Sequence, residues 1–211
     1  MHCYARHYDH CSGLTRVAIH PPMTQRMRER DLGEARARGV RLVIFDVDGV
    51  LTDGGIHLGT IPGAGSVELK RFDVQDGLGI KLLQRAGIQV AFVSGRLSDA
   101  TELRARELSV AECHQAADAR KIPLVEGILA RTGTSWEETA MMADDLPDLA
   151  VFRRVGLRAA VANAQPEVAR LAHWCARNRG GEGAAREFCR ALLIARGEWD
   201  GLLEEYERER S

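Results

Sequence analysis

The sequence predicts a three-layer, Rossmann-like α/β domain with a central parallel sheet. Apolar, β-branched runs alternate along the chain with stretches rich in helix-forming residues, which is typical of parallel strands joined by helical crossovers. The apolar runs are continuous, which suits strands that are covered on both faces. In such a sheet ligands bind beyond the carboxyl ends of the strands, so polar residues at those ends are the candidates for chemistry.

Five apolar runs are the expected strands, and they end near Asp46, Ser94, Cys113, Asp144 and Ala162. The expected helices cover residues 24–38, 76–86, 98–108, 118–130 and 147–153. Asp76 and Ser98 are suitable N-caps for two of these helices, because a short side-chain oxygen can accept from the first free backbone N–H groups.

One segment interrupts the alternation of strands and helices. Residues 54–72 contain two short strand-like runs around a Pro/Gly-rich link, which predicts a β-hairpin. Because the hairpin follows the first strand directly, we expect it to lie over the site as a small flap. The expected organisation is a loose tail over 1–24, one domain over 25–200 and a C-terminal tail over 201–211.

Composition excludes several classes of protein. The 211 residues carry a net charge of −1, so no general attraction to nucleic acid or membranes is expected. No apolar run approaches the roughly 18–20 residues of a membrane span, and the first residues lack the apolar core of a secretory signal, so we expect a cytoplasmic protein. Five cysteines without a C-x-x-C pair indicate free thiols. The Cys3, His7, His10 and Cys11 cluster matches no standard zinc spacing.

The segment FDVDGVLTD, residues 45–53, is the strongest chemical signal. Asp46 and Asp48 are two residues apart at a strand end, so their side chains point to the same side. Two converging carboxylates favour a hard cation such as Mg²⁺, which also bridges to phosphate. One carboxylate can then attack phosphorus, while the other exchanges a proton with the leaving alcohol. A calcium loop is excluded, because Gly49 is at the fourth position instead of the sixth.

Three further segments follow at later strand ends. Ser94 and Gly95 of VSGR can hold phosphate oxygens, although S-G-R is also a common turn. Lys121 can stabilise negative charge, although most helix lysines are solvated. In MMADDLPDL, Asp144 is the expected third protein ligand to Mg²⁺. Asp145 and Asp148 can bind the waters of the metal or orient Lys121, and Asp145 also suits a helix N-cap.

Together these four segments resemble the haloacid dehalogenase (HAD) superfamily of phosphotransferases over roughly residues 40–196. Within it the chain is most similar to the 3-deoxy-D-manno-octulosonate 8-phosphate phosphatase family, through VRLVIFDVDGVLTDG, LKRFDVQDGLGIKLLQRAGIQVAFVSGR, ADDLPDLAVFRRVGLRAAVANAQPEV and GGEGAAREFCRALL. The resemblance implies no large cap domain, a homotetramer assembled through the hairpin, and a glycine-rich segment, residues 180–183, that reaches an active site. The implied reaction is hydrolysis of a sugar phosphate in lipopolysaccharide biosynthesis.

The resemblance also implies roles for individual residues. Asp46 is the nucleophile and a Mg²⁺ ligand, and Asp48 is the general acid/base, which offers its backbone carbonyl to the metal. The implied phosphate-binding residues are Ser94, Gly95 and Lys121. Asp144 completes the metal site with Asp145 alongside, and Asp76 and Gly77 lie where family members approach the substrate.

Three residues depart from the family pattern. Ala143 replaces a glycine before the paired aspartates, Glu182 replaces an arginine in the glycine-rich segment, and Gln75 replaces a basic residue. The two lost positive charges weaken the case for an acidic sugar substrate. A phosphatase for a nine-carbon sugar acid phosphate is a first alternative. A non-catalytic subunit, like the delta subunit of phenylphosphate carboxylase, is a second alternative, but a scaffold has no need of Asp46, Asp48 and Asp144 together.

Overall fold

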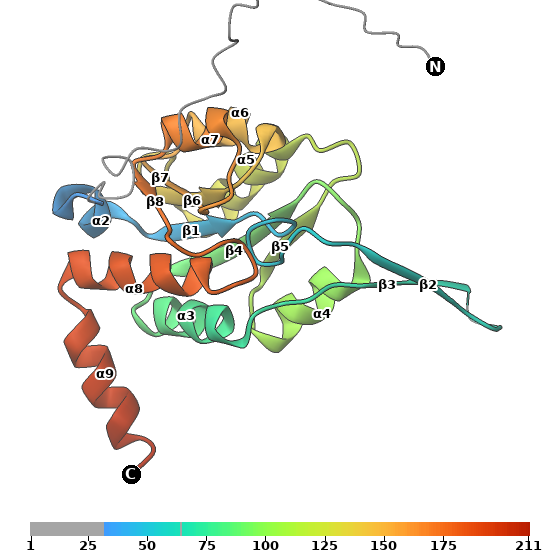
Figure 1. Cartoon of the computed structure of the whole chain (residues 1–211). Coiled ribbons are helices and arrows are strands. Elements are labelled where there is room, and N and C mark those ends of the chain that lie inside the picture. Colours follow the sequence, from blue (N-terminus) through green and yellow to red (C-terminus); the bar gives the residue numbers. More distant parts are fainter. Residues whose placement is uncertain (1–31, 64) are drawn as a thin grey trace, which may run out of the picture.

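The computed structural model describes residues 32–63 and 65–211, which form a parallel sheet with helices on both faces (Figure 1). The strands of the sheet are β1 (Leu42–Phe45), β4 (Gln89–Ser94), β5 (Glu112–Gln115), β6 (Thr139–Ala143), β7 (Leu157–Ala160) and β8 (Trp174–Cys175). Within these residues the strand order is β5-β4-β1-β6-β7-β8, with each neighbouring pair parallel. The predicted fold class is confirmed, and β1 lies in the middle of the sheet.

Two helical layers cover the two faces of the sheet. The helices are α3 (Val74–Arg85), α4 (Asp99–Glu107) and α8 (Ala184–Arg196) on one side, and α5 (Lys121–Thr132), α6 (Leu149–Phe152) and α7 (Pro166–Leu171) on the other (Figure 1). Side chains alternate along β1, so Val43 and Phe45 join the core under α3 and α8. Leu42 and Ile44 join the core under α5, α6 and α7. All four are fully buried, as the continuous apolar run predicts.

Several helix boundaries differ from the prediction. Helix α3 begins earlier, because Asp73 and not Asp76 is its N-cap, with Oδ1 of Asp73 accepting a 2.6 Å hydrogen bond from Gln75 N. Ser98 does precede α4 as predicted, but its side chain makes no capping hydrogen bond. Helix α5 begins at Lys121, and the predicted helix over 147–153 is a 3₁₀ turn, η1 (Leu146–Asp148), followed by α6.

The C-terminal end of the described chain is more helical than the sequence suggested, whereas at the N-terminal end only part of the predicted helix lies among the described residues. At the N-terminal end, α2 (Glu34–Gly39) covers the last part of the predicted 24–38 helix, while the 1–24 tail and the Cys/His cluster lie outside the described residues. At the C-terminal end, α9 (Trp199–Arg208) occupies most of the segment expected as a tail, and it extends away from α8 (Figure 1). No described helix has both the length and the apolar character that crossing a membrane requires.

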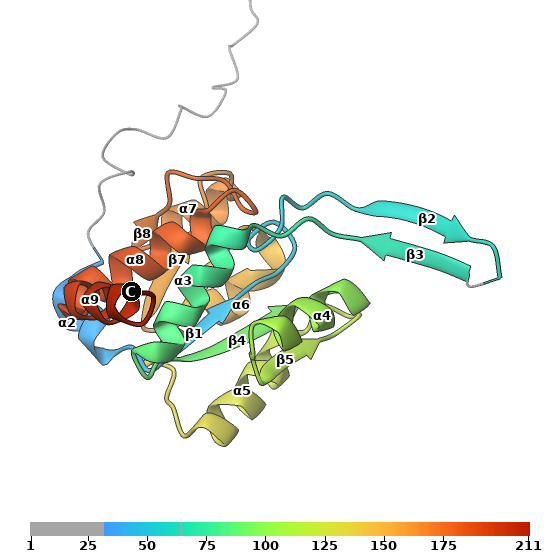
Figure 2. The same cartoon turned by 90° about the horizontal axis from the view of Figure 1, so that it is seen from below.

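The predicted hairpin is present as β2 (His57–Ile61) paired antiparallel with β3 (Gly65–Leu69). It projects from the body of the domain (Figure 2), and a bridge between Thr52 and Phe72 closes its base. Three apolar side chains on it are exposed, by 77% at Leu58, 51% at Ile61 and 61% at Leu69. In the described residues, this hairpin is inserted after β1 and no large cap domain is present.

Candidate active site

The candidate site lies at the carboxyl end of β1. Asp46 follows β1 directly, Ser94 is the last residue of β4, and Asp144 follows β6. Phe45 is paired in register with Phe92 of β4 and with Met142 of β6. Because the three strands are parallel and adjacent, their carboxyl ends bring these polar residues to one edge of the sheet, as predicted.

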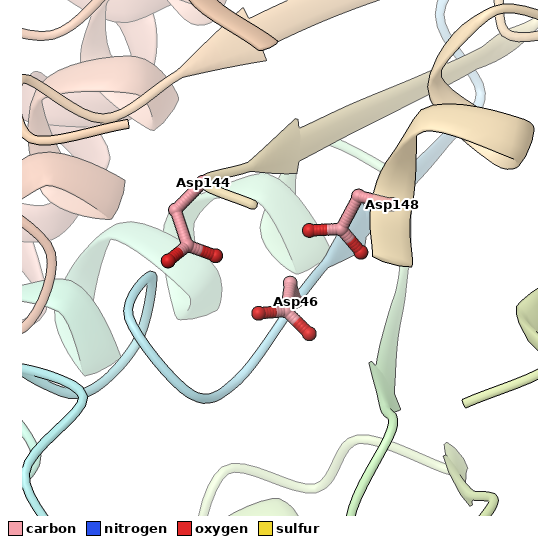
Figure 3. Close-up of side chains that lie close together, drawn as sticks. All are labelled: Asp46, Asp144 and Asp148. Carbon is pink, nitrogen blue, oxygen red and sulfur yellow. The ribbon is translucent and has the colours of Figure 1, made fainter. Parts of the chain in front are cut away.

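Three carboxylates converge at this edge. Asp46, Asp144 and Asp148 each offer an oxygen, and these oxygens all lie within 4.8 Å of one another (Figure 3). Asp46 and Asp148 are almost fully buried, at 5% and 1% exposure. Asp148 is the last residue of the turn η1, and its side chain lies near that of Asp46 (Figure 3).

Lys121 neutralises part of this negative charge. Its Nζ lies 2.5 Å from Oδ1 of Asp46 and 2.5 Å from Oδ1 of Asp148. Burial disfavours the ammonium form, but the charges of the two carboxylates outweigh this effect and raise the pKa of Lys121. Lys121 is therefore a cation within the site, held by Asp148 as predicted.

The remaining carboxylate charge makes the site suitable for a divalent cation. Burial raises the pKa of Asp144 to about 8 and that of Asp148 to about 7, and the neighbouring charge of Asp46 adds to both shifts. Oδ1 of Asp144 is buried and has no hydrogen-bond partner among the described residues. An oxygen-rich cluster with a buried oxygen left unpaired fits a hard cation such as Mg²⁺, which takes carboxylate ligands.

The loop after Asp46 depends on a glycine. Gly49 has a φ of 97°, and a Cβ at this position would lie 2.1 Å from Oδ2 of Asp144. Only glycine lets the Asp144 carboxylate lie against the loop. The glycine-rich segment packs on the same loop, since Gly181 N donates to Val50 O at 3.0 Å and a Cβ at Gly180 would overlap the backbone oxygen of Gly49.

Asp48 lies beside the carboxylate cluster with its own partners. Ser94 Oγ lies 3.1 Å from Oδ2 of Asp48 and donates to it. Oδ1 of Asp48 lies 2.6 Å from Nζ of Lys70, which directly follows β3 of the hairpin. The Asp48 carboxylate is therefore engaged by hydroxyl and ammonium donors, apart from the three clustered carboxylates.

A cavity of about 200 Å³ opens at this edge of the sheet. Six of the residues to which the resemblance assigns a role line it, namely Asp46, Asp48, Gly95, Lys121, Asp144 and Asp145, whereas Ser94 is fully buried and does not. Asp145 is exposed, and its Oδ1 accepts from Leu146 N at 2.7 Å, so it caps the turn η1 as the N-cap interpretation predicted. Asp148 and Arg96 also line the cavity.

Asp76 and Gly77 lie elsewhere. Asp76 is 2% exposed in α3, and its Oδ1 accepts from Arg186 N of α8 at 2.7 Å. Gly77 is also buried, and a Cβ there would lie 2.6 Å from Nη2 of Arg104. Neither residue lines the cavity that holds Asp46. Their contact with a substrate stays a prediction, and their observed partners are those of helix packing.

The three residues that depart from the family pattern differ in their exposure to solvent. The methyl group of Ala143 is fully buried in the core under α5 and α6, so it does not line the cavity. Glu182 and Gln75 are exposed.

Sequence reasoning missed Lys70, whose side chain is fully buried against Asp48. Its position in a run of alternating strand-like residues gave no signal of burial.

Comparisons with known proteins find relatives of the chain. No protein-family model matches the chain. The 3-deoxy-D-manno-octulosonate 8-phosphate phosphatase KdsC of Yersinia pestis is 39% identical over 166 residues, which cover 79% of this chain and 86% of that protein. The same enzyme of Escherichia coli K12 matches with equal identity and coverage.

Solved structures show the same likeness. The Y. pestis enzyme superposes with a TM-score of 0.75 over 81% of this chain and 90% of that one, at 39% identity. The Moraxella catarrhalis enzyme, solved with a magnesium ion, a phosphate ion and a KDO molecule, has a TM-score of 0.76 and 32% identity over 82% of this chain and 97% of that one. Sequence, fold and site together show that the chain is a phosphatase of the HAD superfamily and belongs to the 3-deoxy-D-manno-octulosonate 8-phosphate phosphatase family.

Proposed function

We propose that this chain is a Mg²⁺-dependent phosphomonoester hydrolase that acts through an aspartyl-phosphate on Asp46, with 3-deoxy-D-manno-octulosonate 8-phosphate as its substrate. One observation carries the proposal: Asp46, Lys121 and Asp144 converge on a cavity large enough for a phosphoryl group at the carboxyl end of β1. A carboxylate placed there can attack phosphorus, and the neighbouring ammonium stabilises the charge that develops.

The proposed reaction has two steps. In the first, a carboxylate oxygen of Asp46 bonds to phosphorus, and the bond from phosphorus to the sugar oxygen breaks. The electron pair leaves with that oxygen, which takes a proton from Asp48. In the second, water attacks phosphorus and gives a proton to Asp48, and the bond from phosphorus to Asp46 breaks. The products are the free sugar acid and inorganic phosphate, and both aspartates return to their starting states.

The residues present fit a magnesium ion. The carboxylates of Asp46 and Asp144 and the backbone carbonyl of Asp48 would hold it, and Asp145, at the rim of the cavity, would bind its waters. When bound, the ion supplies positive charge that offsets the carboxylates and the phosphate. The unpaired buried oxygen of Asp144 supports this assignment.

Three residues would hold the phosphate. Lys121 and Gly95 line the cavity, Lys121 as a buried cation, whereas Ser94 precedes Gly95 and is itself fully buried outside the lining. The hydroxyl of Ser94 already contacts Asp48, so it would hold the phosphate and the proton donor in one arrangement. Together they would fix the phosphorus within reach of Asp46.

The substrate proposal comes from the relatives, which are named for 3-deoxy-D-manno-octulosonate 8-phosphate. The cavity of about 200 Å³ is smaller than the roughly 300–1,000 Å³ usual for a small-molecule site, so it would hold the phosphoryl end while the sugar lies across the rim. A nine-carbon sugar acid phosphate is the competing substrate. Glu182 and Gln75 stand where basic residues are expected, which weakens charge pairing with either sugar acid.

The test is a panel of phosphorylated sugar acids, scored by kcat/KM with Mg²⁺ and after chelation. Asp46→Asn is expected to lose activity roughly 10³-fold or more, because it removes the nucleophile. Asp200→Asn, at an exposed carboxylate in α9, is the matched control and is expected to keep full activity. If Asp46→Asn retained more than about a tenth of the wild-type rate, the proposed mechanism would be wrong.

A homotetramer and a cytoplasmic location complete the proposal. The exposed apolar residues Leu58, Ile61 and Leu69 on the projecting hairpin support assembly through this element, because exposed apolar groups on such an arm mark contact surfaces. Light scattering after size-exclusion chromatography tests the tetramer, which a Leu58→Ser variant is expected to weaken. Cell fractionation tests the location.

A further inference from the structure

Lys70 has an unusual environment for a residue at the base of an exposed hairpin. Its side chain is fully buried, whereas Leu69 before it is 61% exposed and the next side chain, that of Arg71, is 57% exposed. Its Nζ lies 2.6 Å from Oδ1 of Asp48 and 3.4 Å from Oγ1 of Thr101. A buried ammonium is retained only where partners compensate for the lost water, so Lys70 has a specific partner in Asp48.

The two oxygens of Asp48 are held from two directions. Oδ2 accepts from Ser94 Oγ at 3.1 Å, and Oδ1 faces Lys70. Ser94 belongs to the sheet, whereas Lys70 belongs to the segment that returns from the hairpin. Two donors on separate elements fix both the position and the plane of a carboxylate, which a single hydrogen bond does not.

Glu68 connects β3 to the loop after β4. It lies two residues before Lys70, so both side chains point to the same side of the strand. Its Oε2 lies 2.7 Å from Nη2 of Arg96, a residue that lines the cavity, and its Oε1 lies 3.6 Å from Nζ of Lys70. The end of β3 is thus fastened to the loop after β4, and Lys70 is held in place.

We propose that Lys70 is a positioning residue that orients the side chain of Asp48, so that its protonated carboxyl group can transfer a proton to the leaving sugar oxygen. The inference rests on the proposed role of Asp48. The residues that line the cavity do not include Lys70, so Lys70 acts through Asp48 and not by touching the phosphate. A displacement of about 1 Å in a reacting group can cost roughly 10²-fold in rate, so removing one of two anchors is expected to slow the reaction strongly.

Comparing two substrates with different leaving groups distinguishes this positioning role from a general structural role. A sugar alkoxide needs a proton as it leaves, whereas the nitrophenolate of p-nitrophenyl phosphate leaves without one. In Lys70→Met, kcat for 3-deoxy-D-manno-octulosonate 8-phosphate is expected to fall roughly 10²-fold, while kcat for p-nitrophenyl phosphate falls less than about threefold. Lys70→Gln keeps a neutral hydrogen-bond donor, so its kcat for the sugar phosphate is expected to fall less than that of Lys70→Met.

Two reference variants complete the experiment. Arg71→Met removes the exposed neighbouring cation and is expected to leave both rates unchanged. Asp48→Asn is expected to show the same selective loss as Lys70→Met, only larger.

Equal losses on the two substrates in Lys70→Met, or an unchanged rate on the sugar phosphate, overturn the proposal for Lys70. If Asp48→Asn itself loses both activities equally, the proposed acid role of Asp48 fails instead. Misfolding of Lys70→Met would be recognised by loss of both p-nitrophenyl phosphate hydrolysis and the native circular dichroism spectrum. In that case Lys70→Gln decides, by the same comparison of kcat for the sugar phosphate with kcat for p-nitrophenyl phosphate.

Discussion

Replacing Asp76 by asparagine is expected to stabilise the protein at neutral pH. Asp76 is 2% exposed, and burial raises its pKa to about 6. Oδ1 of Asp76 accepts from Arg186 N, while its Oδ2 is buried without a hydrogen-bond partner among the described residues. Asparagine has the same shape and keeps one carbonyl oxygen for Arg186 N, but it carries no charge that burial penalises.

The expected magnitude follows from the pKa. The change from 3.8 to about 6 corresponds to about 3 kcal/mol, since one unit is about 1.4 kcal/mol. Because the folded-state pKa is raised, the folded protein binds this proton more tightly than the unfolded chain. The contribution of Asp76 to stability is therefore complete below the unfolded pKa and is lost as the pH rises through about 6. The uncharged side chain of Asp76→Asn does not ionise, so the variant does not lose this stability as the pH rises.

Urea denaturation at about pH 4.5 and about pH 7.5 measures the effect. The stability advantage of Asp76→Asn over wild type is expected to be small at the lower pH and to approach about 3 kcal/mol at the higher pH. Asp99→Asn, at an exposed carboxylate in α4, controls for net charge. A variant less stable than wild type at both pH values would refute the reasoning. An unchanged KM would favour the packing role of Asp76 over substrate contact.

Two further predictions concern the loop and the metal site. Gly180→Ala would place a Cβ 1.7 Å from the backbone oxygen of Gly49, so it is expected to cost about 1–3 kcal/mol in urea denaturation and to lower kcat. Gly201→Ala, in open space on α9, is the control, and equal stability of the two variants would contradict the packing argument. Asp144→Asn removes one of three clustered carboxylates, so calorimetry is expected to show a metal-free Tm higher by about 2–4 °C, corresponding to about 1 kcal/mol, and no further rise with Mg²⁺. A Mg²⁺-dependent rise in Tm equal to that of wild type would show that Asp144 does not bind the metal.

Much of the site was predictable because it lies at strand ends. Continuous apolar runs locate β1, β4 and β6, and in a parallel sheet the residues that follow such strands share one edge. Asp46, Ser94 and Asp144 therefore came together without any knowledge of the loops. Lys121 was placed by the motif order of the resemblance, and its contacts with Asp46 and Asp148 agree with that placement.

Other features depend on contacts that sequence does not express. Asp73 and Asp76 are both possible caps three residues apart, and only the packing of α3 on α8 decides between them. Lys70 is one charged residue among several in its segment, and only the fold buries it. The helices after residue 183 did carry a signal, since buried residues recur with helical spacing at Ala185, Phe188, Cys189, Leu192 and Leu193.

The contact between the glycine-rich segment and the loop after Asp46 has a consequence for how the enzyme is made. The ribosome synthesises the loop at residues 46–53 early, yet the backbone that supports it, at Gly180 and Gly181, emerges more than a hundred residues later. At roughly 5–20 residues per second, this interval lasts about 7–27 s. During that time a nascent chain has Asp46 and Asp48 but not the backbone of Gly180 and Gly181 that packs against their loop, so activity should appear only once the last third of the polypeptide has left the exit tunnel.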